Sequence, residues 1–433
     1  MLSNDWQYLL GEEFCSKVTD GTHDSPKQAE YGKPLITSKH IKADEIDFDT
    51  AYLISEKDFN EINKRSQVEQ WDVIISMIGA YCGFCFIERN EEIDYAVKNV
   101  GLFKTGSEVN AKWLYYYLNS SIGKSHLDKV KGGSTQPYIA LGSLRKLPIL
   151  VPKNHQLKED IVRVLDAIDS KIRVNNRINT ELEAMAKTLY DYWFVQFDFP
   201  DANGKPYKAS GGKMIYNDTL KREIPVGWSD GTLDNLGQIV GGSTPSTADK
   251  NNFSEQGSPW ITPNDLSGNI GNKFISKGAM GVTAEGIKSA SLKKYPAGSV
   301  LLSSRAPIGY MAIARNTLTT NQGFKSFVPS KGFPTEFVYF TVKNSLKAII
   351  QYASGSTFKE VSGTVIKTVK LALPPNELVE EFRKKVEDFF KRQDTLEQEN
   401  EQLIALRDWL LPMLMNGQVT VKPRTEVQEA QHG

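Results

Sequence analysis

Residues 157–193 read LKEDIVRVLDAIDSKIRVNNRINTELEAMAKTLYDYW, and residues 378–414 read LVEEFRKKVEDFFKRQDTLEQENEQLIALRDWLLPML. In both stretches mostly apolar or amide side chains recur at alternating steps of four and three residues, over more than four heptads. A stripe this long is typical of a coiled coil, because a helix inside a single domain rarely keeps the spacing beyond two turns. At ~1.5 Å per residue each helix is a rod of roughly 50 Å, and two matching rods in one chain are expected to pack on each other.

Amides interrupt these stripes, among them Asn175 and Asn179 in the first helix and Asn400 in the second. In an antiparallel pair that crosses near the middle of both helices, Asn175 faces Asn400 and Asn179 faces Leu396. A buried amide pair lowers stability but fixes register and direction. We therefore predict that Asn175 and Asn400 meet inside the helix pair.

The sequence outside the helices repeats as well, about 222 residues apart. Val73-Ile74-Ile75-Ser76 returns as Val300-Leu301-Leu302-Ser303, and Gly133-Ser134-Thr135 returns as Gly355-Ser356-Thr357. The other repeated segments are Trp6 and Trp228, Val18–Thr22 and Val240–Thr244, Pro34–Thr37 and Pro259–Thr262, and Asn99–Gly101 and Asn321–Gly323. Solenoid repeats run roughly 20–50 residues, so this longer period indicates a duplicated domain together with its helix.

Composition places the chain among ordinary globular proteins. Its 433 residues are enough for two to three domains, and 40% of them are hydrophobic. Three cysteines are too few for a disulfide framework, and we identify neither a membrane span nor a signal peptide, so a cytoplasmic location is expected. Lys+Arg equals Asp+Glu at 52 each, which argues against strong DNA binding without a partner.

Short β-branched and aromatic runs between Gly, Pro, Asn and Asp predict mixed strand and turn structure outside the helices. The expected fold class is α/β (mixed), with two similar domains separated by two long helices that form a coiled coil, as an internal pseudo-twofold duplication. The expected boundaries are 1–153 for the first domain, 154–197 for the first helix, 198–224 for an ordered connector, 225–375 for the second domain, 376–417 for the second helix and 418–433 for a disordered tail.

Several segments together carry a resemblance to a known family. They are the connector 199–214, Ile224–Trp228, Gly241–Pro245, Asn321–Phe324, Gly355–Phe358 and, in the first half, Asp20–His23. The chain resembles the specificity subunit of type I restriction–modification enzymes, over essentially its whole length and in order. It departs where the first half opens with Asn4-Asp5-Trp6 rather than Ile-Pro-x-Gly-Trp, and where Val100 stands against Gln322.

The resemblance implies that each domain is a target-recognition domain that reads one half of a bipartite, asymmetric DNA site. It also implies that the two helices form an antiparallel coiled coil between the domains. Two methyltransferase subunits and restriction subunits are then expected as partners around this helical spacer. S-adenosylmethionine, ATP and magnesium are then expected in those partners, and no cofactor in this chain. Partner subunits would carry much of the phosphate clamp, which reconciles DNA binding with a net charge of zero.

Polar and basic side chains in the recurring loops are the expected DNA contacts, because base edges are read by short polar groups and phosphates are held by Lys and Arg. The candidates are Thr22, His23, Lys39, Lys131, Ser134, Gln136, Tyr138, Thr244, Asn264, Arg305, Lys325, Ser356, Thr357 and Lys359. For His23, a turn residue bonded to backbone is an equal alternative. Candidate contacts to partner subunits are Asn175, Asn179, Tyr207, Lys208, Asn400 and Trp409.

The sequence contains only weak matches to metal-binding, redox and phosphate-binding motifs. Cys82 and Cys85 have the spacing of a metal or redox pair, but the repeat puts Ile308 and Met311 opposite them, so we expect apolar positions and no metal site. Gly123-Lys124-Ser125 ends like a phosphate-binding loop without its first glycine. The sequence therefore predicts no catalysis by this chain. Two alternatives stay open, a coiled-coil scaffold without DNA readout and a self-contained methylase or nuclease whose motifs are unrecognised.

Overall fold

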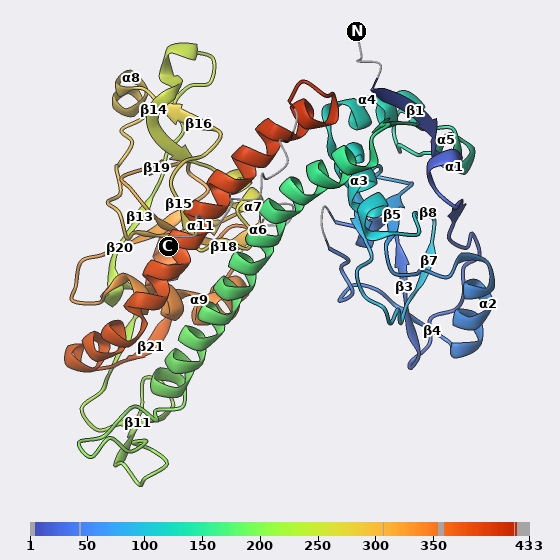
Figure 1. Cartoon of the computed structure of the whole chain (residues 1–433). Coiled ribbons are helices and arrows are strands. Elements are labelled where there is room, and N and C mark those ends of the chain that lie inside the picture. The colour runs from blue at the N-terminus through green and yellow to red at the C-terminus, as the bar shows by residue number, and fades with distance from the viewer. Residues whose placement is uncertain (1–4, 43–44, 306, 354–358, 420, 422–433) are drawn as a thin grey trace, which may run out of the picture. The chain divides into compact units, whose positions relative to one another are not determined.

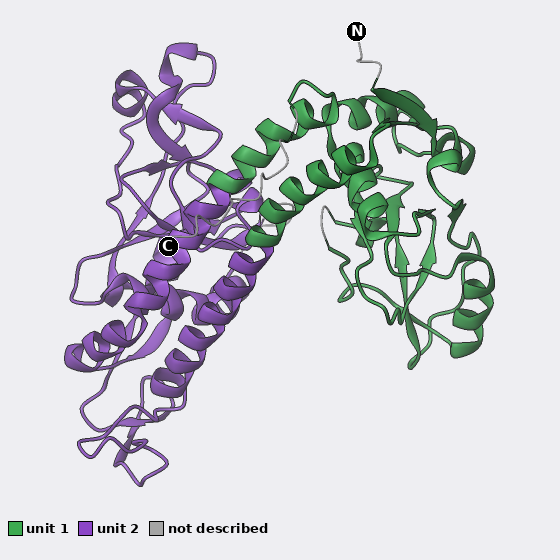
Figure 2. Cartoon of the chain, viewed as in Figure 1, with its two compact units in different colours: residues 1–172, 402–433 green, residues 173–401 purple. Residues whose placement is uncertain are grey.

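The computed structural model describes residues 5–42, 45–305, 307–353, 359–419 and 421 (Figure 1). The chain divides into two compact units, which Figure 2 shows in separate colours. Unit 1 comprises residues 1–172 and 402–433, and unit 2 comprises residues 173–401. Each unit contains one globular domain and its share of both long helices, so the helices do not form a body of their own.

The two predicted long helices are present as α6 (His155–Tyr190) and α11 (Asn376–Met415). The Asn154 side chain caps α6 by accepting the backbone N–H of Gln156 at 2.9 Å, and Pro374-Pro375 precede α11, where proline stops a strand. Helix α6 continues into a π-helical turn, Asp191–Val195. Predicted stripe residues are buried along both helices, namely Ile161, Leu165, Ile168 and Ala186 in α6, Trp193 in the π-helical turn, and Phe382, Val386, Leu396 and Leu414 in α11.

The helices run antiparallel in both units. In unit 2 the Asn175 Nδ2 donates to Asn400 Oδ1 at 2.9 Å, and the rings of Tyr190 and Phe382 lie 6.1 Å apart. A later residue of α6 therefore meets an earlier residue of α11. In unit 1 Arg407 donates to Asp169 at 3.0 Å, which continues the same order. The predicted pairing of Asn175 with Asn400 is confirmed.

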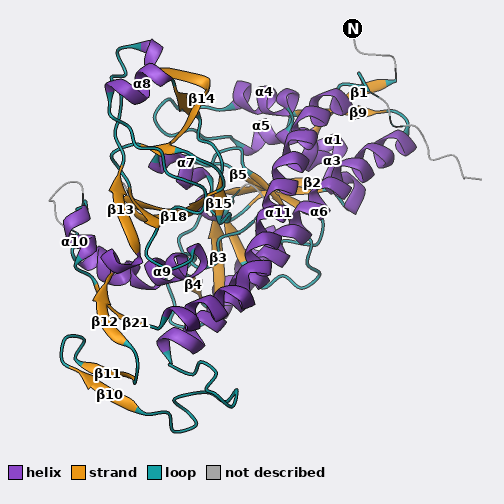
Figure 3. Cartoon of the chain, turned by 90° about the vertical axis from the view of Figure 1, so that its left-hand side faces the viewer, coloured by secondary structure: helices purple, strands orange, loops and turns teal. Residues whose placement is uncertain are grey.

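The domain of unit 1 contains three sheets and five short helices (Figure 3). The sheets have the strand orders β2-β8-β5-β6, β4-β3-β7 and β1-β9. The strands are β1 (Trp6–Leu10), β2 (Lys17–Asp20), β3 (Lys33–Thr37), β4 (Leu53–Ile54), β5 (Asp72–Ser76), β6 (Cys85–Ile87), β7 (Ala96–Lys98), β8 (Val100–Lys104) and β9 (Pro148–Pro152). The helices are α1 (Gly11–Phe14), α2 (Glu56–Ser66), α3 (Glu108–Asn119), α4 (Ser121–Val130) and α5 (Leu141–Arg145).

The domain of unit 2 repeats this plan with additions. Its sheets have the orders β13-β20-β17-β18-β15, β16-β14-β19, β12-β21 and β10-β11. The strands are β10 (Met214–Asn217), β11 (Arg222–Pro225), β12 (Ser229–Thr232), β13 (Gly237–Gly241), β14 (Phe253–Ile261), β15 (Phe274–Ile275), β16 (Met280–Val282), β17 (Val300–Ser304), β18 (Ile308–Ala314), β19 (Thr319–Thr320), β20 (Lys325–Pro329) and β21 (Lys370–Leu373). The short helices are α7 (Pro263–Gly268), α8 (Ala284–Ser289), α9 (Thr335–Gln351) and α10 (Gly363–Lys367).

Strand pairing confirms the duplication. Val73 of β5 pairs antiparallel with Phe103 of β8, and Val300 of β17 pairs antiparallel with Phe327 of β20. In both units a parallel pair lies beside this sheet, β3 with β7 in unit 1 and β14 with β19 in unit 2. The predicted fold class, two similar domains joined to two long helices, is therefore correct.

The register also corrects one detail of the predicted repeat. Phe103 has Val18 as its other neighbour, whereas its counterpart Phe327 has Ile239. Val18 therefore corresponds to Ile239 and not to Val240. Sequence identity alone tolerates a slip of one residue, but in a sheet such a slip turns every side chain to the opposite face.

Each unit has its own hydrophobic core. In unit 1 the central side chains include Trp113 and Tyr117 of α3, packed with Leu165 of α6 and Leu414 of α11. In unit 2, Phe337 and Phe340 of α9 pack with residues of both long helices. Among the described residues, none of the helices is both long and apolar enough to cross a membrane.

Candidate nucleic-acid interface

One hydroxyl joins three loops at the strand ends of unit 1. Ser38 Oγ donates to Asn99 O at 2.7 Å and accepts the backbone N–H groups of Met77 and Ile78 at 3.1 and 3.2 Å. Ser38 directly follows β3, Asn99 lies between β7 and β8, and Met77 follows β5. Because a hydroxyl can donate once and accept twice, this contact satisfies three backbone groups. It holds the loops at Ser38, Met77–Ile78 and Asn99 together as one edge of the domain.

His23 projects from this edge in a fixed position. Its side chain is 64% exposed, yet Nε2 lies 2.9 Å from Asp20 Oδ2 and Nδ1 lies 3.2 Å from Asn99 Oδ1. Asp20 is almost fully buried and also binds Arg65 at 2.5 Å. Thr22, by contrast, has a buried side chain, so the structure does not support the prediction that it reaches DNA.

The glycine-rich loop of unit 1 lies beside the same edge. Tyr138 bridges Ile78 and Gly132 through backbone hydrogen bonds. Gly133 has φ +78°, and a Cβ there would lie 2.4 Å from Gln136 O, so only glycine fits this turn. The predicted residues Ser134, Gln136 and Tyr138 are all exposed on the loop.

The lysines near this edge differ in availability. Lys39 is exposed, whereas Lys131 is half-buried and binds Asp128 at 2.7 Å. Lys42, which sequence reasoning missed, donates to Lys39 O at 3.0 Å and lies 4.2 Å from the centre of the Tyr81 ring. An ammonium group that lies over an aromatic ring keeps its positive charge. Lys42 is therefore a further candidate phosphate contact.

The same edge exists in unit 2, with corrected residue correspondences. The backbone N–H of Ser243 donates to Thr320 O at 3.0 Å, as that of Thr22 donates to Val97 O at 3.0 Å in unit 1. Thr22 therefore corresponds to Ser243 rather than to Thr244. The following residues, His23 and Thr244, occupy equivalent positions.

Equivalent side chains also make equivalent contacts. Thr244 Oγ1 donates to Gln322 Oε1, as the His23 ring contacts the Asn99 amide oxygen. Asn99 and Gln322 thus make equivalent side-chain contacts, although the pairing of Val100 and Phe324 in the strands aligns Asn99 with Gly323. In both units a polar side chain, exposed His23 or half-buried Thr244, contacts a primary amide at the strand end.

A second cross-loop pair is equivalent in the two units. Arg305 forms an antiparallel bridge with Glu360, as Ile78 does with Tyr138. The residue that follows Tyr138 donates its backbone N–H to the carbonyl oxygen of the residue that precedes Ile78, at 2.9 Å. In the same way, the residue that follows Glu360 donates to the residue that precedes Arg305, at 3.0 Å. The backbone is therefore the same, while the side chains are apolar in unit 1 and charged in unit 2.

Charges gather around Glu360 in unit 2. Its carboxylate lies 4.0 Å from Arg305 Nη1 and 3.8 Å from Lys325 Nζ. Burial lowers the pKa of Lys325, although Glu360 opposes this shift. Three of the predicted DNA contacts, Arg305, Lys325 and the exposed Lys359, therefore lie together.

Of the remaining DNA-contact candidates of unit 2, the structure describes Asn264 but not Ser356 and Thr357. Asn264 is exposed in the first turn of α7, where Thr262 caps the helix. Ser356 and Thr357 lie outside the described residues. Besides Lys42, the structure adds four residues that were not among the predicted DNA contacts, namely Ile78, Asn99, Gln322 and Glu360, and the strand register and loop pairing reveal them.

The amides predicted to contact partner subunits are buried inside the chain. Asn175 is 0% exposed, and Asn179 and Asn400 are 6% and 5% exposed. Asn400 also donates to Asn176 Oδ1 at 2.7 Å, and Gln393 donates to Asn179 O at 3.0 Å. Asn175 and Asn400 are turned toward each other and Asn179 is buried, so these three side chains are not exposed for contact with a partner subunit.

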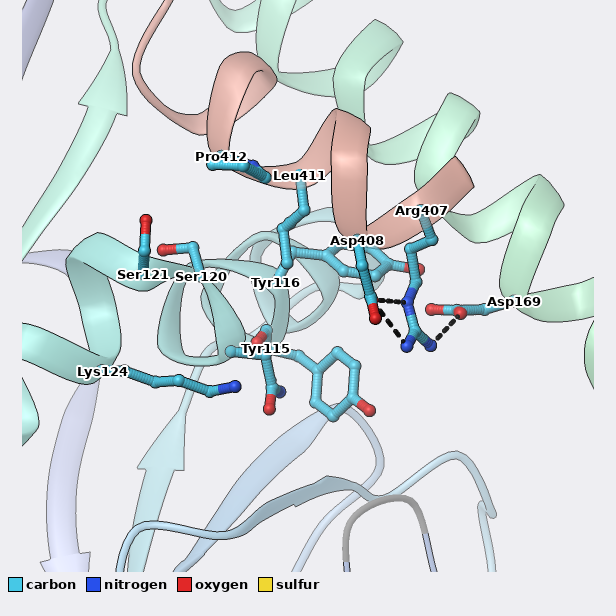
Figure 4. Close-up of a pocket in the computed structure, with 11 residues that line it drawn as sticks. Tyr115, Tyr116, Ser120, Ser121, Lys124, Asp169, Arg407, Asp408, Leu411 and Pro412 are labelled. Atoms are coloured by element: carbon cyan, nitrogen blue, oxygen red, sulfur yellow. Dashed lines mark hydrogen bonds and ion pairs between the residues drawn. The ribbon is translucent and has the colours of Figure 1, made fainter. Parts of the chain in front are cut away.

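The other predicted subunit contacts are accessible. Trp409 is 63% exposed, Lys208 is exposed and Tyr207 stacks on Phe199 with 4.7 Å between ring centres. A cleft of about 440 Å³ in unit 1 is lined by α3, α4 and the end of α11. Figure 4 shows Arg407 between Asp169 and Asp408 in this cleft, at 3.0 and 2.9 Å.

The cysteines are buried in the core of unit 1. Cys82 lies in a turn rather than a strand and donates to Met77 O at 3.5 Å, and Cys85 lies in β6. Burial raises the pKa of the Cys82 thiol, which disfavours the thiolate that metals bind. Within the described part of the chain, no group of three or more His, Cys, Asp or Glu residues could hold a metal ion.

Comparison with known proteins gives one consistent family. A family model described as the type I restriction modification DNA specificity domain matches residues 4–184 and again residues 225–405. The chain is 26% identical over 408 residues to the type I restriction enzyme HindI specificity subunit of Haemophilus influenzae, covering 82% of this chain and 88% of that one.

A second relative matches over a shorter length. The type I restriction enzyme MjaIX specificity subunit of Methanocaldococcus jannaschii is 40% identical over 166 residues, which are 37% of this chain and 38% of that relative. Among solved structures, the type I restriction–modification system S subunit from M. genitalium has a TM-score of 0.57 at 13% identity, covering 96% of this chain and 97% of that chain. The last similarity supports the fold alone.

Proposed function

Because the chain belongs to the family of type I restriction–modification DNA specificity proteins, as its two matched domains show, we propose that it selects the DNA sequence on which such an enzyme acts. Each domain reads one half of a bipartite site. The observation that carries this proposal is the pair of equivalent edges, alike in backbone and different in side chains. Two half-sites of different sequence require this combination.

The chemistry of the edges suits groove readout. His23 with Asn99, and Thr244 with Gln322, present amide and hydroxyl or imidazole groups that match the donors and acceptors of base edges. Lys39 and Lys359 are exposed beside them and can contact phosphates. The remaining candidates, including Asn264, keep the same proposed role.

Partner subunits would supply the chemistry. We assign the methyl transfer, with S-adenosylmethionine and base flipping, to two methyltransferase subunits, and ATP- and magnesium-dependent cleavage to restriction subunits. This chain would then be a non-catalytic subunit that works with DNA in the cytoplasm. A complex of this kind shares the phosphate contacts among several chains, in keeping with the net charge of zero.

The decisive experiment is to map methylation directed by the full chain together with its methyltransferase subunit. We expect methylated adenines within one bipartite, asymmetric sequence. Methylation without a sequence preference, or no selective DNA retention by the complex, would instead favour the scaffold alternative. Methylation or cleavage by the chain alone would favour a self-contained enzyme.

The exposed Trp409 is the candidate contact of α11 for the methyltransferase. Exposed aromatic side chains of this size are enriched among residues that dominate interfaces. Trp409→Ser should weaken binding of the methyltransferase subunit at least tenfold and leave the melting temperature of the chain unchanged. Tyr31→Ser is the matched control, because Tyr31 is 80% exposed in unit 1 but lies in a loop far along the chain from α11.

A further inference from the structure

The Ile78–Tyr138 pair and the Arg305–Glu360 pair occupy the same structural position in the two units. Ser76 pairs with Val100 as Ser303 pairs with Phe324, and each bridge begins two residues after that serine. The surrounding backbone therefore holds both pairs at the same place on the edge. Any difference in what the two positions recognise must come from the side chains.

Those side chains offer opposite chemistry. Ile78 and Tyr138 are 37% and 50% exposed and present an apolar surface. Arg305 and Glu360 have side chains 35% and 44% exposed and present a cation and an anion. Lys325 adds a charge in unit 2 where its structural counterpart in unit 1 is Gly101.

Arg305 lies near Glu360 but does not form a hydrogen-bonded ion pair with it. Its Nη1 lies 4.0 Å from Glu360 Oε2, whereas a hydrogen-bonded guanidinium–carboxylate pair has a separation of about 2.7–2.9 Å. Glu360 also lies 3.8 Å from Lys325, so its charge is shared between two cations. The guanidinium fork therefore keeps donors for a ligand with two adjacent acceptors, which in the major groove is guanine.

From this geometry we infer that the bridged pair is a specificity-determining position for one base pair in each half-site. In unit 2 Arg305, oriented by Glu360, selects a G·C pair. In unit 1 Ile78 and Tyr138 select an A·T pair through contact with the thymine methyl group, which only apolar side chains recognise. The inference rests on the proposed function and adds to it the residues that make the half-sites differ.

The side-chain amides of Asn99 and Gln322, which lie near the bridged pairs, have a different role. Asn99 and Gln322 both present a primary amide at the strand end, with its oxygen contacted by His23 or Thr244. Among the described residues neither amide nitrogen has a hydrogen-bond partner, so both can approach a base edge. A primary amide is therefore common to the two units, whereas the bridged pair is apolar in one unit and charged in the other.

The test exchanges the bridged pair between the units of the full chain. The variant Arg305→Ile with Glu360→Tyr is combined with the methyltransferase subunit, and retention is measured on DNA libraries randomised in one half-site. We expect the preference for G·C over A·T at one position of one half-site to fall by roughly 5- to 150-fold, the range of a bidentate contact, with the other half-site unchanged. The reciprocal variant, Ile78→Arg with Tyr138→Glu, should alter only the other half-site.

Two further variants make the outcome decisive. Arg305→Lys keeps the charge but loses the fork, so it should lose the same preference while total DNA retention stays within about twofold. Lys331→Ile with Asp234→Tyr changes an exposed pair, 3.8 Å apart, beyond the other end of β20, and should leave both half-sites unchanged.

The possible failures are distinguishable. If the unaltered complex shows no bipartite preference, the proposed function is wrong. If it shows one, and both Arg305 variants retain every base preference, the assignment of the bridged pair is wrong. If a double variant fails to assemble, Arg305→Lys alone decides between these results.

Discussion

At the scale of single residues, the amides of the helix pair form a small hydrogen-bonded network, in which the buried Oδ1 atom of Asn175 has no partner. Asn175 Nδ2 is 2.9 Å from both Glu399 Oε2 and Asn400 Oδ1, and Asn400 donates in turn to Asn176. Removing one partner leaves a buried polar group unpaired, which costs ~1–3 kcal/mol, whereas replacing both partners by apolar groups does not. The network therefore defines register more than it adds stability.

We predict that Asn175→Leu alone lowers the melting temperature, and that Asn175→Leu with Asn400→Leu raises it above the single variant while loosening register. Thermal unfolding of the full chain measures the first effect, and crosslinking between cysteines introduced on the two helices measures the second. Gln398→Leu on the exposed face of α11 is the control. A double variant less stable than the two single losses combined would contradict the expectation.

A second residue-scale feature is a buried charge cluster in unit 2. Glu397 accepts the backbone N–H of Lys273 and Phe274 at 2.7 and 3.0 Å and lies 3.1 Å from Arg315. Burial nevertheless raises the pKa of Glu397 to about 7. Lys273 binds Glu183 at 2.6 Å, and burial lowers the pKa of Lys273 to about 8.

This cluster predicts a pH dependence whose sign follows from the Glu397 shift. The folded state binds a proton more tightly than the unfolded state, whose pKa is near 4.5, so stability falls as pH rises from about 4.5 to about 7. The loss is at most about 3 kcal/mol for a shift of this size. Glu397→Gln should remove it, seen as a flatter melting-temperature profile over that range. Parallel profiles for the two proteins would contradict the assignment.

At the scale of elements, the stripes of α6 and α11 pack on each other as a continuous seam of buried side chains, with contacts between the helices in each compact unit. If the paired helices are the ruler between the two half-sites, inserting one heptad in each, near residues 178 and 399, keeps the seam in phase and adds ~10 Å. The preferred DNA spacer should then grow by one to about three base pairs, with both half-site sequences unchanged. Methylation mapping measures the spacer, and an active variant with the original spacer would show that the helices do not set it.

At the scale of the whole molecule, duplication makes the domains separable in specificity. Replacing residues 1–150 by the equivalent segment of a relative should change one half-site and leave the other intact. Residues 38–70 and 263–298 differ in length and composition between the repeats, as expected if each domain reads its own sequence. Methylation mapping of the chimera tests this, and a joint change of both half-sites would exclude modular recognition.

The sequence alone determined the large-scale plan, because that plan rests on periodicities that survive along the chain. The stripes of α6 and α11 predicted long paired helices. The family resemblance predicted that the helices are antiparallel, and the positions of Asn175 and Asn400 in the stripes then predicted the register. The repeated strands predicted a duplicated α/β domain, which strand pairing and the family match confirm. These features depend on local chemistry read at a fixed spacing.

Only the tertiary structure decided which side chains share an edge. The pairs His23–Asn99, Thr244–Gln322 and Arg305–Glu360 join residues 55 to 78 positions apart, through strand register and loop bridges. A one-residue slip in the repeat, invisible in sequence identity, aligned buried Thr22 with Thr244, although the backbone contacts place His23 opposite Thr244. Hydrogen bonding between distant strands sets the register, and no local pattern reports it, because each backbone can pair at several offsets until a whole core is packed.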